Sequence, residues 1–275
     1  MGSNPDLLSC WREKLISEAE LAITDSCTEH PHRFRDAMIC MSNTTRPVEL
    51  SLIACGAARW CGGSYEEGMP AAVTAHLLRA AITSHATLPG FESIFTANTP
   101  PLWKDFDEAT SILVGDALIP LAVTHLVSNG GRHASAMIED AMEAIGGIGV
   151  LAGISLEQQK RSTALTGETE TWELWAGALS RFAAVSGARF VGATERQLDQ
   201  ISLMGLEVGR AWCMLSGAVG VTLDSRRGQD LHQEALTILE EARVLAGSGE
   251  EGALLRQITG YFRNRAPGDP SDLFF

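Results

Sequence analysis

Apolar residues recur along the chain at the spacing of three and four that predicts amphipathic α-helices. Near the start, Leu8, Trp11 and Leu15 fall on one side of such a helix and Glu13 falls on the other. The pattern predicts helices over residues 5–23, 31–41, 48–60, 64–86, 107–127, 133–159, 168–191, 194–223, 230–246 and 250–265. No segment alternates as a β-strand does, and no internal repeat is present. We therefore expect an all-α fold.

These helices fit one domain, because the sequence contains no linker and 275 residues are enough to bury a substantial core. We expect a single helical domain over residues 1–275, with residues 1–4 as an added or flexible leader and 266–275 as a tail. The segment 48–60 is apolar nearly all round and should be central. The glycine-rich run 146–149 (GGIG) predicts a kink or a close helix contact inside the helix that contains it.

The stretch 71–126 has the outline of an active site. It predicts a helix that ends near His85, an irregular loop over residues 89–102 and a second helix over residues 107–127. Because a loop of this length inside a compact domain is usually functional, we interpret it as a lid or the remnant of one. Asp116 lies within the apolar part of the second helix, so it needs a hydrogen-bonding or charged partner if it is buried.

Charge and composition exclude several classes of protein. A net charge of −13 and a pI near 5.0, without any basic run, disfavour nucleic acid as a partner. The most apolar run, residues 111–127, is interrupted by Asp116, Pro120 and His125, and a membrane span needs about 20 apolar residues. We therefore expect no membrane-spanning segment. The six cysteines lack CxxC spacing and should be reduced thiols, with Cys40, Cys55 and Cys213 as small apolar residues of the core.

Residues that could carry chemistry are sparse. Divalent-metal chemistry on a diphosphate needs clustered carboxylates on facing helices. Pairs such as Glu240 with Glu241 fall on polar faces, and the helix end at residues 84–87 (SHAT) carries no carboxylate. The sequence therefore predicts no metal site and no cofactor in this chain. A nucleophilic pair of Ser84 with His85 is disfavoured, because adjacent residues of a helix point in different directions.

The order of landmarks resembles that of the trans-isoprenyl diphosphate synthases. Arg46-Pro47 opens an apolar helix, and an alanine-rich helix ends at His85 before Leu88-Pro89. The following helix contains Gly115-Asp116-Ala117-Leu118, which is the most specific part of a similarity that covers residues 46–222. The resemblance implies an isoprenoid-synthase-type helical bundle around a central cavity, and such bundles are usually paired into dimers.

The same resemblance implies that the ligands of the family's chemistry have been lost. The family's first Asp-rich motif falls on residues 86–92 (ATLPGFE) and its second on residues 215–220 (LSGAVG). The segment that holds isopentenyl diphosphate is replaced by residues 42–45 (SNTT), and a Lys-Thr-Gly pattern by residues 175–177 (WAG). We therefore expect no catalytic residue in this chain. The vestigial substrate-site positions are Arg46, His85, Ala86, Thr87, Glu92, Ser216, Gly217 and Gly220.

Such a chain resembles the non-catalytic small subunits of plant geranyl or geranylgeranyl diphosphate synthases. The resemblance implies a catalytic large subunit as partner, in a heterodimer or heterotetramer, whose activity or product length this chain alters. Mg²⁺ would belong to that partner, and the location would be the plastid stroma after loss of a transit peptide, or otherwise the cytoplasm. The expected contact residues are Ser51 and Cys55, where the subunits often carry a CxxxC pair, with Ile112, Asp116, Ile119 and Val123.

Two other functions stay open at this point. The first is a divergent isoprenoid synthase or cyclase that uses other carboxylates, such as Glu92, Asp116 or Glu168. The second is a carrier that binds an isoprenoid within the bundle without chemistry. Magnesium-dependent binding of a diphosphate would distinguish a divergent synthase from a silent subunit. A solid core without a cavity would count against a carrier.

Overall fold

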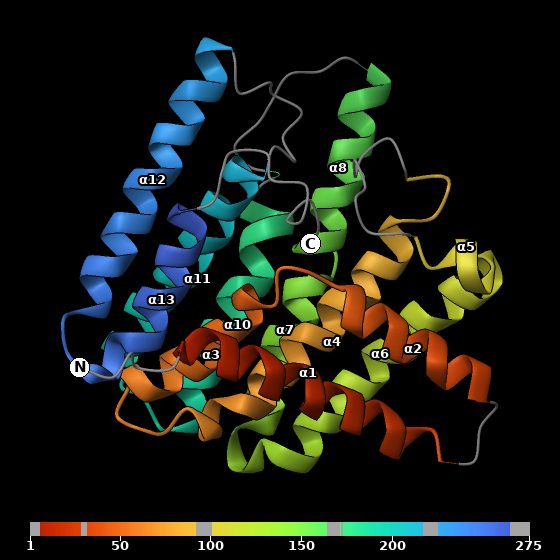
Figure 1. Ribbon diagram of the computed structural model, residues 1–275, viewed down its shortest axis with the longest axis horizontal. Helices are drawn as coiled ribbons and strands as arrows, with labels where there is room; N and C mark the ends of the chain where they lie inside the picture. Colours follow the sequence, from red (N-terminus) through yellow and green to blue (C-terminus); the bar gives the residue numbers. More distant parts are fainter. Residues whose placement is uncertain are drawn as a thin grey trace.

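The computed structural model describes residues 6–28, 32–91, 101–163, 171, 173–216 and 225–264, and every regular element within them is helical (Figure 1). The longer helices are α1 (Leu7–Ser26), α2 (His32–Thr44), α3 (Glu49–Trp60), α4 (Met69–Ala86), α6 (Glu108–Asn129), α7 (Ala134–Ile145), α8 (Val150–Thr163), α10 (Ala178–Phe190), α11 (Glu195–Leu215), α12 (Arg226–Ala246) and α13 (Ala253–Arg263). The short elements are η1 (Glu66–Gly68), α5 (Trp103–Phe106), η2 (Gly131–His133), the π-helical turn η3 (Glu173–Gly177) and η4 (Glu250–Gly252). The predicted all-α fold is confirmed for this part of the chain.

Most helix boundaries follow the predicted signals, but the helix predicted over residues 194–223 ends at Leu215, and the one predicted over residues 133–159 is divided. A single helix over residues 133–159 is wrong, because α7 ends at Ile145 and α8 begins at Val150. A Cβ atom on Gly149 would lie 2.1 Å from the carbonyl oxygen of Ala144, so the chain turns too tightly there for a side chain. The glycine-rich run therefore separates two helices instead of kinking one.

A reciprocal pair of hydrogen bonds caps the turn that precedes α4. Ser64 Oγ accepts a hydrogen bond from the backbone N–H of Glu67 at 3.3 Å, and the Glu67 carboxylate accepts one from the N–H of Ser64 at 2.7 Å. This reciprocal pair caps the 3₁₀ turn η1, and α4 proper begins after it with Pro70 in its first turn. The helix predicted over residues 64–86 is therefore a capped 3₁₀ turn followed by an α-helix.

Three helices, α3, α4 and α10, form the centre of the bundle. Residues 49–58 of α3 are all buried, and so is almost all of α4. Helix α10 contacts α3, α4, α7 and α11, and it crosses α3 so closely that a Cβ atom on Gly187 would lie 2.1 Å from the carbonyl oxygen of Ala54. Alanine and glycine are required at this crossing because they let two backbones approach closely.

The remaining helices surround this centre (Figure 1). Helices α1 and α2 contact each other, and both also contact α4 and α6. Helices α12 and α13 form the opposite edge, where α12 contacts α11 and α13 contacts α3. The start of α1 is joined to α13 by a hydrogen bond of 2.8 Å from the backbone N–H of Leu8 to Gln257 Oε1.

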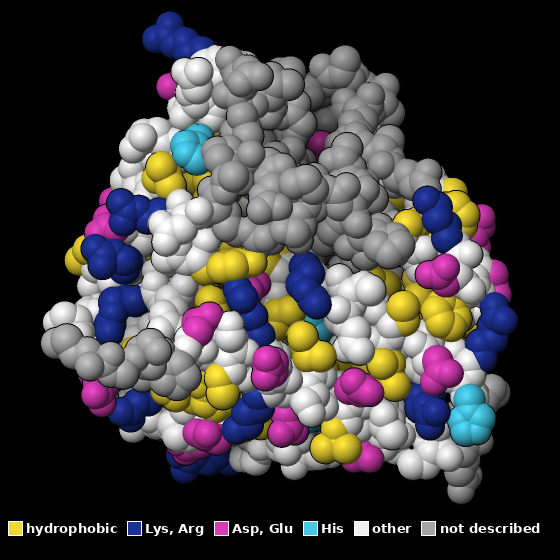
Figure 2. Space-filling view, viewed as in Figure 1, with side chains coloured by type: hydrophobic (Ala, Val, Ile, Leu, Met, Phe, Trp, Pro, Cys, Tyr) yellow, Lys and Arg dark blue, Asp and Glu magenta, His cyan; other side chains and the backbone are white. Residues whose placement is uncertain are grey.

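Charged side chains of both signs are mixed on the face shown in Figure 2. Lys and Arg side chains alternate with Asp and Glu, and small apolar areas lie between them. The described residues of this face therefore form no extended basic surface of the kind that binds a phosphate backbone.

The close crossing of α3 and α10 predicts opposite effects of the same substitution at two helical glycines. Gly187→Ala should lower the free energy of unfolding by roughly 1–3 kcal/mol, because the added methyl group meets the backbone of Ala54. In Gly260→Ala, in α13, no atom lies within 4 Å of the added carbon. This substitution should raise the free energy of unfolding by about 0.5–1 kcal/mol, because alanine has the higher helix propensity. Urea denaturation of the two variants checks both signs, and equal effects would contradict the proposed backbone clash.

Candidate functional site

The candidate site is the C-terminal end of α4, where the predicted positions His85, Ala86 and Thr87 lie. Two side chains of this segment bond to the first turns of α6. Ser84 Oγ donates a hydrogen bond to the carbonyl oxygen of Ser111 at 2.7 Å, and His85 Nε2 donates one to that of Ile112 at 3.1 Å. These bonds hold the two helices of the predicted helix–loop–helix side by side.

Gly115 and Asp116 of α6 both lie against the imidazole of His85. A Cβ atom on Gly115 would lie 2.2 Å from His85 Nε2, so only glycine leaves room for the imidazole. Asp116 Oδ1 lies 3.5 Å from the same nitrogen. Asp116 is exposed, so the condition under which it would need a partner does not apply, although His85 lies beside it. The pair links the last turn of α4 to α6.

The end of α4 is closed. Ala86 and Thr87 are only 3% and 4% exposed. Thr87 Oγ1 donates a hydrogen bond to the carbonyl oxygen of Thr83 at 3.0 Å, and the indole N–H of Trp103 in α5 donates one to the carbonyl oxygen of Thr87 at 2.9 Å. Leu102, beside Trp103, is also buried. The polar groups of Thr87 are thus used to finish the helix.

These residues do not fit a magnesium ion. Mg²⁺ requires oxygen ligands in octahedral geometry, usually from carboxylates. Ala86 has no ligand atom, and the hydroxyl of Thr87 is already bonded within α4. Among the described residues no group of three or more His, Cys, Asp or Glu could hold a metal ion. We therefore derive no magnesium-dependent step from this end of α4.

Of the other vestigial positions, the structure describes only some. Ser216 ends α11, is buried, and donates a hydrogen bond from Oγ to the carbonyl oxygen of Cys213 at 2.9 Å. Glu92, Gly217, Gly220 and the alternative carboxylate Glu168 lie outside the described residues, as does most of the predicted loop over 89–102.

Arg46 lies in the segment between α2 and α3, and its charge acts on a buried imidazole of α4. Its Nη1 donates a hydrogen bond to the carbonyl oxygen of Thr45 at 2.8 Å. His76 is fully buried, and its Nε2 donates to the carbonyl oxygen of Ser42 at 3.0 Å. Burial lowers the pKa of His76 to about 4, and the positive charges of Arg79 and Arg46 act in the same direction.

A buried charge network was not predicted from the sequence. Arg79 of α4 is 1% exposed, and its Nε and Nη2 have no hydrogen-bond partner. Burial lowers its pKa to about 9, while the negative charge of Glu49 of α3 opposes that shift. Glu49 also forms an ion pair with Arg12 of α1. A charged residue within each of two otherwise apolar segments was the only available signal, and it does not reveal that the charge of Glu49 acts on Arg79 in the fold.

One face of α6 is apolar and open to solvent. Ile112 and Val127 are 45% and 60% exposed, and Ile119 and Val123 are partly buried. Of the described helices, α6 alone is long and apolar enough to cross a membrane, with a mean hydropathy of 1.6, but only by length and composition. Because α6 packs along α4, and bundle helices pass the same test, this is weak evidence for a span.

Two of the predicted contact residues are placed elsewhere. Ser51 and Cys55 are completely buried in α3, so they cannot lie on a surface that meets a partner, and this part of the prediction is wrong. The reason is that α3 is covered on all sides by α1, α4, α10 and α13. Ile112, Asp116, Ile119 and Val123 all lie on α6 and stay candidates.

The chain is similar in sequence to several known proteins. No protein-family model matches the chain. A dimethylallyltranstransferase of Fischerella ambigua is 28% identical over 226 residues, which cover 79% of this chain and 64% of that protein. The small subunit of a chloroplastic heterodimeric geranylgeranyl pyrophosphate synthase of Arabidopsis thaliana is 25% identical over 241 residues, which cover 82% of this chain and 70% of that protein. The chain thus spans about two thirds of the length of these relatives.

Solved structures give the same fold. A farnesyl/geranylfarnesyl diphosphate synthase of Zymomonas mobilis has a TM-score of 0.80 at 18% identity, with 92% of this chain and 98% of that chain covered. The small subunit of the geranyl diphosphate synthase of Antirrhinum majus has a TM-score of 0.66 at 20% identity, with 92% and 99% covered. The homologues and structural neighbours of this chain are therefore trans-isoprenyl diphosphate synthases, as the order of landmarks predicted.

The buried imidazole predicts a pH dependence of stability. Because the pKa of His76 is about 4 in the fold, against 6.5 for the ordinary side chain, the unfolded chain binds more protons between these values. The contribution of His76 is therefore complete above pH 6.5 and is lost as the pH falls towards 4, by roughly 2–4 kcal/mol.

His76→Gln should remove this part of the pH dependence. Denaturant titrations from pH 7 to pH 4.5 measure the slope, with the exposed His32→Gln as the matched control. A wild-type slope retained in His76→Gln would contradict the assignment.

Proposed function

We propose that this chain is a catalytically silent subunit that pairs with a catalytic prenyl diphosphate synthase and changes its rate or product length. The observation that carries the proposal is the closed end of α4. In place of metal ligands it has Ala86 and Thr87, both buried, with the Thr87 carbonyl bonded to Trp103. A synthase ionises its allylic substrate by stabilising the departing diphosphate with cations, and this helix end has no group for that task.

Relatives with such a role support the proposal. The Arabidopsis relative is the small subunit of a heterodimeric synthase, and the Antirrhinum structure is also of a small subunit. By analogy, the partner of this chain would be a catalytic geranylgeranyl or related prenyl diphosphate synthase, in a heterodimer or heterotetramer. That partner would supply the Mg²⁺. Because the Arabidopsis relative is chloroplastic, a plastid location belongs to the same proposal.

The apolar face of α6 is the surface we assign to the partner. Ile112, Leu113 and Val127 are exposed there, and Ile119 and Val123 lie partly buried beside them. Burying one such side chain in an interface contributes about 1.5–3 kcal/mol. Asp116, paired with His85 in the middle of this face, gives the apolar surface one charged position that can fix the register of a partner helix.

A divergent synthase is the second candidate, because the Fischerella relative is named as a transferase and the Zymomonas synthase has the higher TM-score of the two solved structures. It would need other carboxylates. Of those the sequence offered, Asp116 points to His85, and Glu92 and Glu168 lie outside the described residues. An isoprenoid carrier has less support, because neither of two pockets formed by described residues is lined by α4.

Assays of product formation separate the candidates. The purified chain, given Mg²⁺, isopentenyl diphosphate and an allylic diphosphate, should form no product above the protein-free control. Adding it to a catalytic geranylgeranyl diphosphate synthase should change the turnover rate or the product length of that enzyme. Sustained turnover by the chain alone would overturn the proposal and favour the divergent synthase.

The assigned surface makes a prediction of its own. Leu113→Glu on α6 should weaken binding to the catalytic subunit at least about ten-fold, because it replaces an apolar contact with a charge. Leu203→Glu, at a similarly exposed leucine of α11, is the matched control and should bind like wild type. Surface plasmon resonance measures both affinities, and equal losses would show that the α6 face is not the contact.

A further inference from the structure

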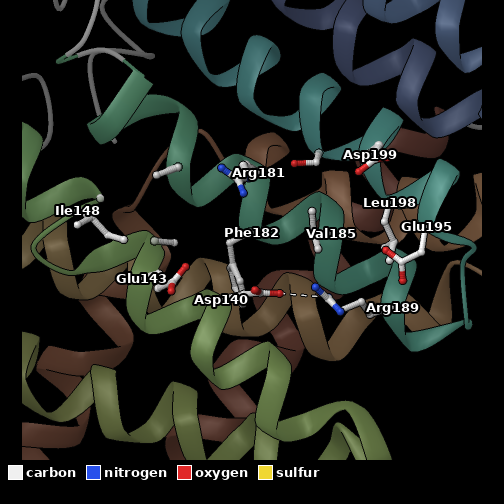
Figure 3. Close-up of a pocket in the computed structure, with 14 residues that line it drawn as sticks. Asp140, Glu143, Ile148, Arg181, Phe182, Val185, Arg189, Glu195, Leu198 and Asp199 are labelled. Atoms are coloured by element: carbon white, nitrogen blue, oxygen red, sulfur yellow. Dashed lines mark ion pairs between the residues drawn. The ribbon is translucent and has the colours of Figure 1, made fainter.

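A pocket with a volume of about 260 Å³ lies between α7, α10 and α11 (Figure 3). None of its lining residues belongs to α4 or to the last two turns of α11, so it is separate from the candidate site. Its floor is apolar and consists of Phe182 and Val185 of α10, with Leu198 of α11 beside them. A concave site of this size with an apolar floor suits a small organic group.

Carboxylates face each other across this floor. Asp140 and Glu143 come from α7 on one side, and Glu195 and Asp199 come from α11 on the other (Figure 3). Arg189 of α10 is already engaged by Asp140, with 3.1 Å between Nε and the carboxylate oxygen. The remaining three carboxylates form no ion pair with any residue of the described chain.

The local charge is therefore negative. Once Asp140 and Arg189 neutralise each other, three carboxylates remain against one guanidinium, that of Arg181. Arg181 and the three carboxylates are all exposed, so solvent weakens each of these charges, and the excess of two negative charges remains. Such an arrangement repels a phosphate or diphosphate and attracts a cation.

Helix position makes one of these charges unfavourable for folding. Glu143 lies in the last turn of α7, where the helix dipole disfavours a negative charge. Glu195, in contrast, lies in the first turn of α11, where the dipole favours a carboxylate. The helix dipole thus accounts for a carboxylate at Glu195 but not for one at Glu143. This difference suggests that the charge of Glu143 serves binding rather than stability.

We propose that this pocket binds an ammonium or guanidinium group carried on a short apolar chain, with Glu143 and Asp199 as its charge partners and Phe182 and Val185 in contact with the chain. The cation would bridge carboxylates from α7 and α11 that otherwise only repel each other. A diamine and a basic side chain of a protein both present this chemistry. The proposal does not depend on the proposed function.

Agmatine, which joins a guanidinium and an amine by four methylene groups, is the probe. Isothermal titration calorimetry at low salt should show binding to the full chain, and butan-1-ol should show none. Glu143→Gln and Asp199→Asn should each raise the dissociation constant of agmatine about five-fold or more. Added salt should raise it further. Glu139→Gln, on the same helix but outside the pocket, is the matched control and should bind like wild type.

A substitution of Arg181 distinguishes a cation site from an anion site by the direction of its effect on binding. Arg181→Gln should tighten agmatine binding, whereas an anion pocket would lose its ligand. Glu143→Gln should also raise the thermal midpoint slightly while it weakens binding, because it removes a charge disfavoured by the helix dipole.

Two further outcomes complete the test. Binding of a lysine- and arginine-containing peptide but not of agmatine, with the same response to the variants, would identify the source of the cation as a protein side chain. No binding of either probe, or equal losses in Glu139→Gln and Glu143→Gln, would overturn the proposal.

Discussion

The burial of α4 on all sides is the constraint on which the rest of the structure depends. Helices α1, α2, α3, α6 and α10 all contact it, and two charged or titratable residues, His76 and Arg79, are enclosed within it. Small residues make this possible, since Gly115 admits the imidazole of His85 and Gly187 lets α10 approach α3. Close packing of this kind leaves little freedom to any single residue of the centre.

The same burial shapes the candidate site. The end of α4 is satisfied within the fold, by the hydroxyl of Thr87 and by the indole of Trp103, and the described residues form no cluster that could hold a metal ion there. Apolar surface is instead displayed on the outer face of α6. In the function that we propose, the buried end of α4 and the apolar outer face of α6 suit a bundle that acts on a partner through contact rather than through its own chemistry.

Periodicity predicted the helices well, because the spacing of apolar residues is a local property. The glycine run at 146–149 was expected to mark a kink or a close helix contact, since sequence alone does not show how tightly such a run turns. The exposure of Asp116 could not be read from an apolar helix, so the expectation of a partner for a buried Asp116 does not apply. Ser51 and Cys55 were placed on the partner surface by the resemblance to small subunits, although the apolar pattern of residues 48–60 already indicated a central helix. The influence of Glu49 on Arg79 and the acidic pocket both involve separate helices, which only the fold brings together.

The central claim is that the end of α4 has lost its magnesium-dependent site. Isothermal titration calorimetry of the purified chain with a non-reactive allylic diphosphate analogue, with and without Mg²⁺, tests it most directly. Our account predicts that Mg²⁺ does not tighten the binding of the analogue. A magnesium-dependent increase in affinity at one analogue per chain would contradict it, and would show that carboxylates elsewhere in the chain complete an active site.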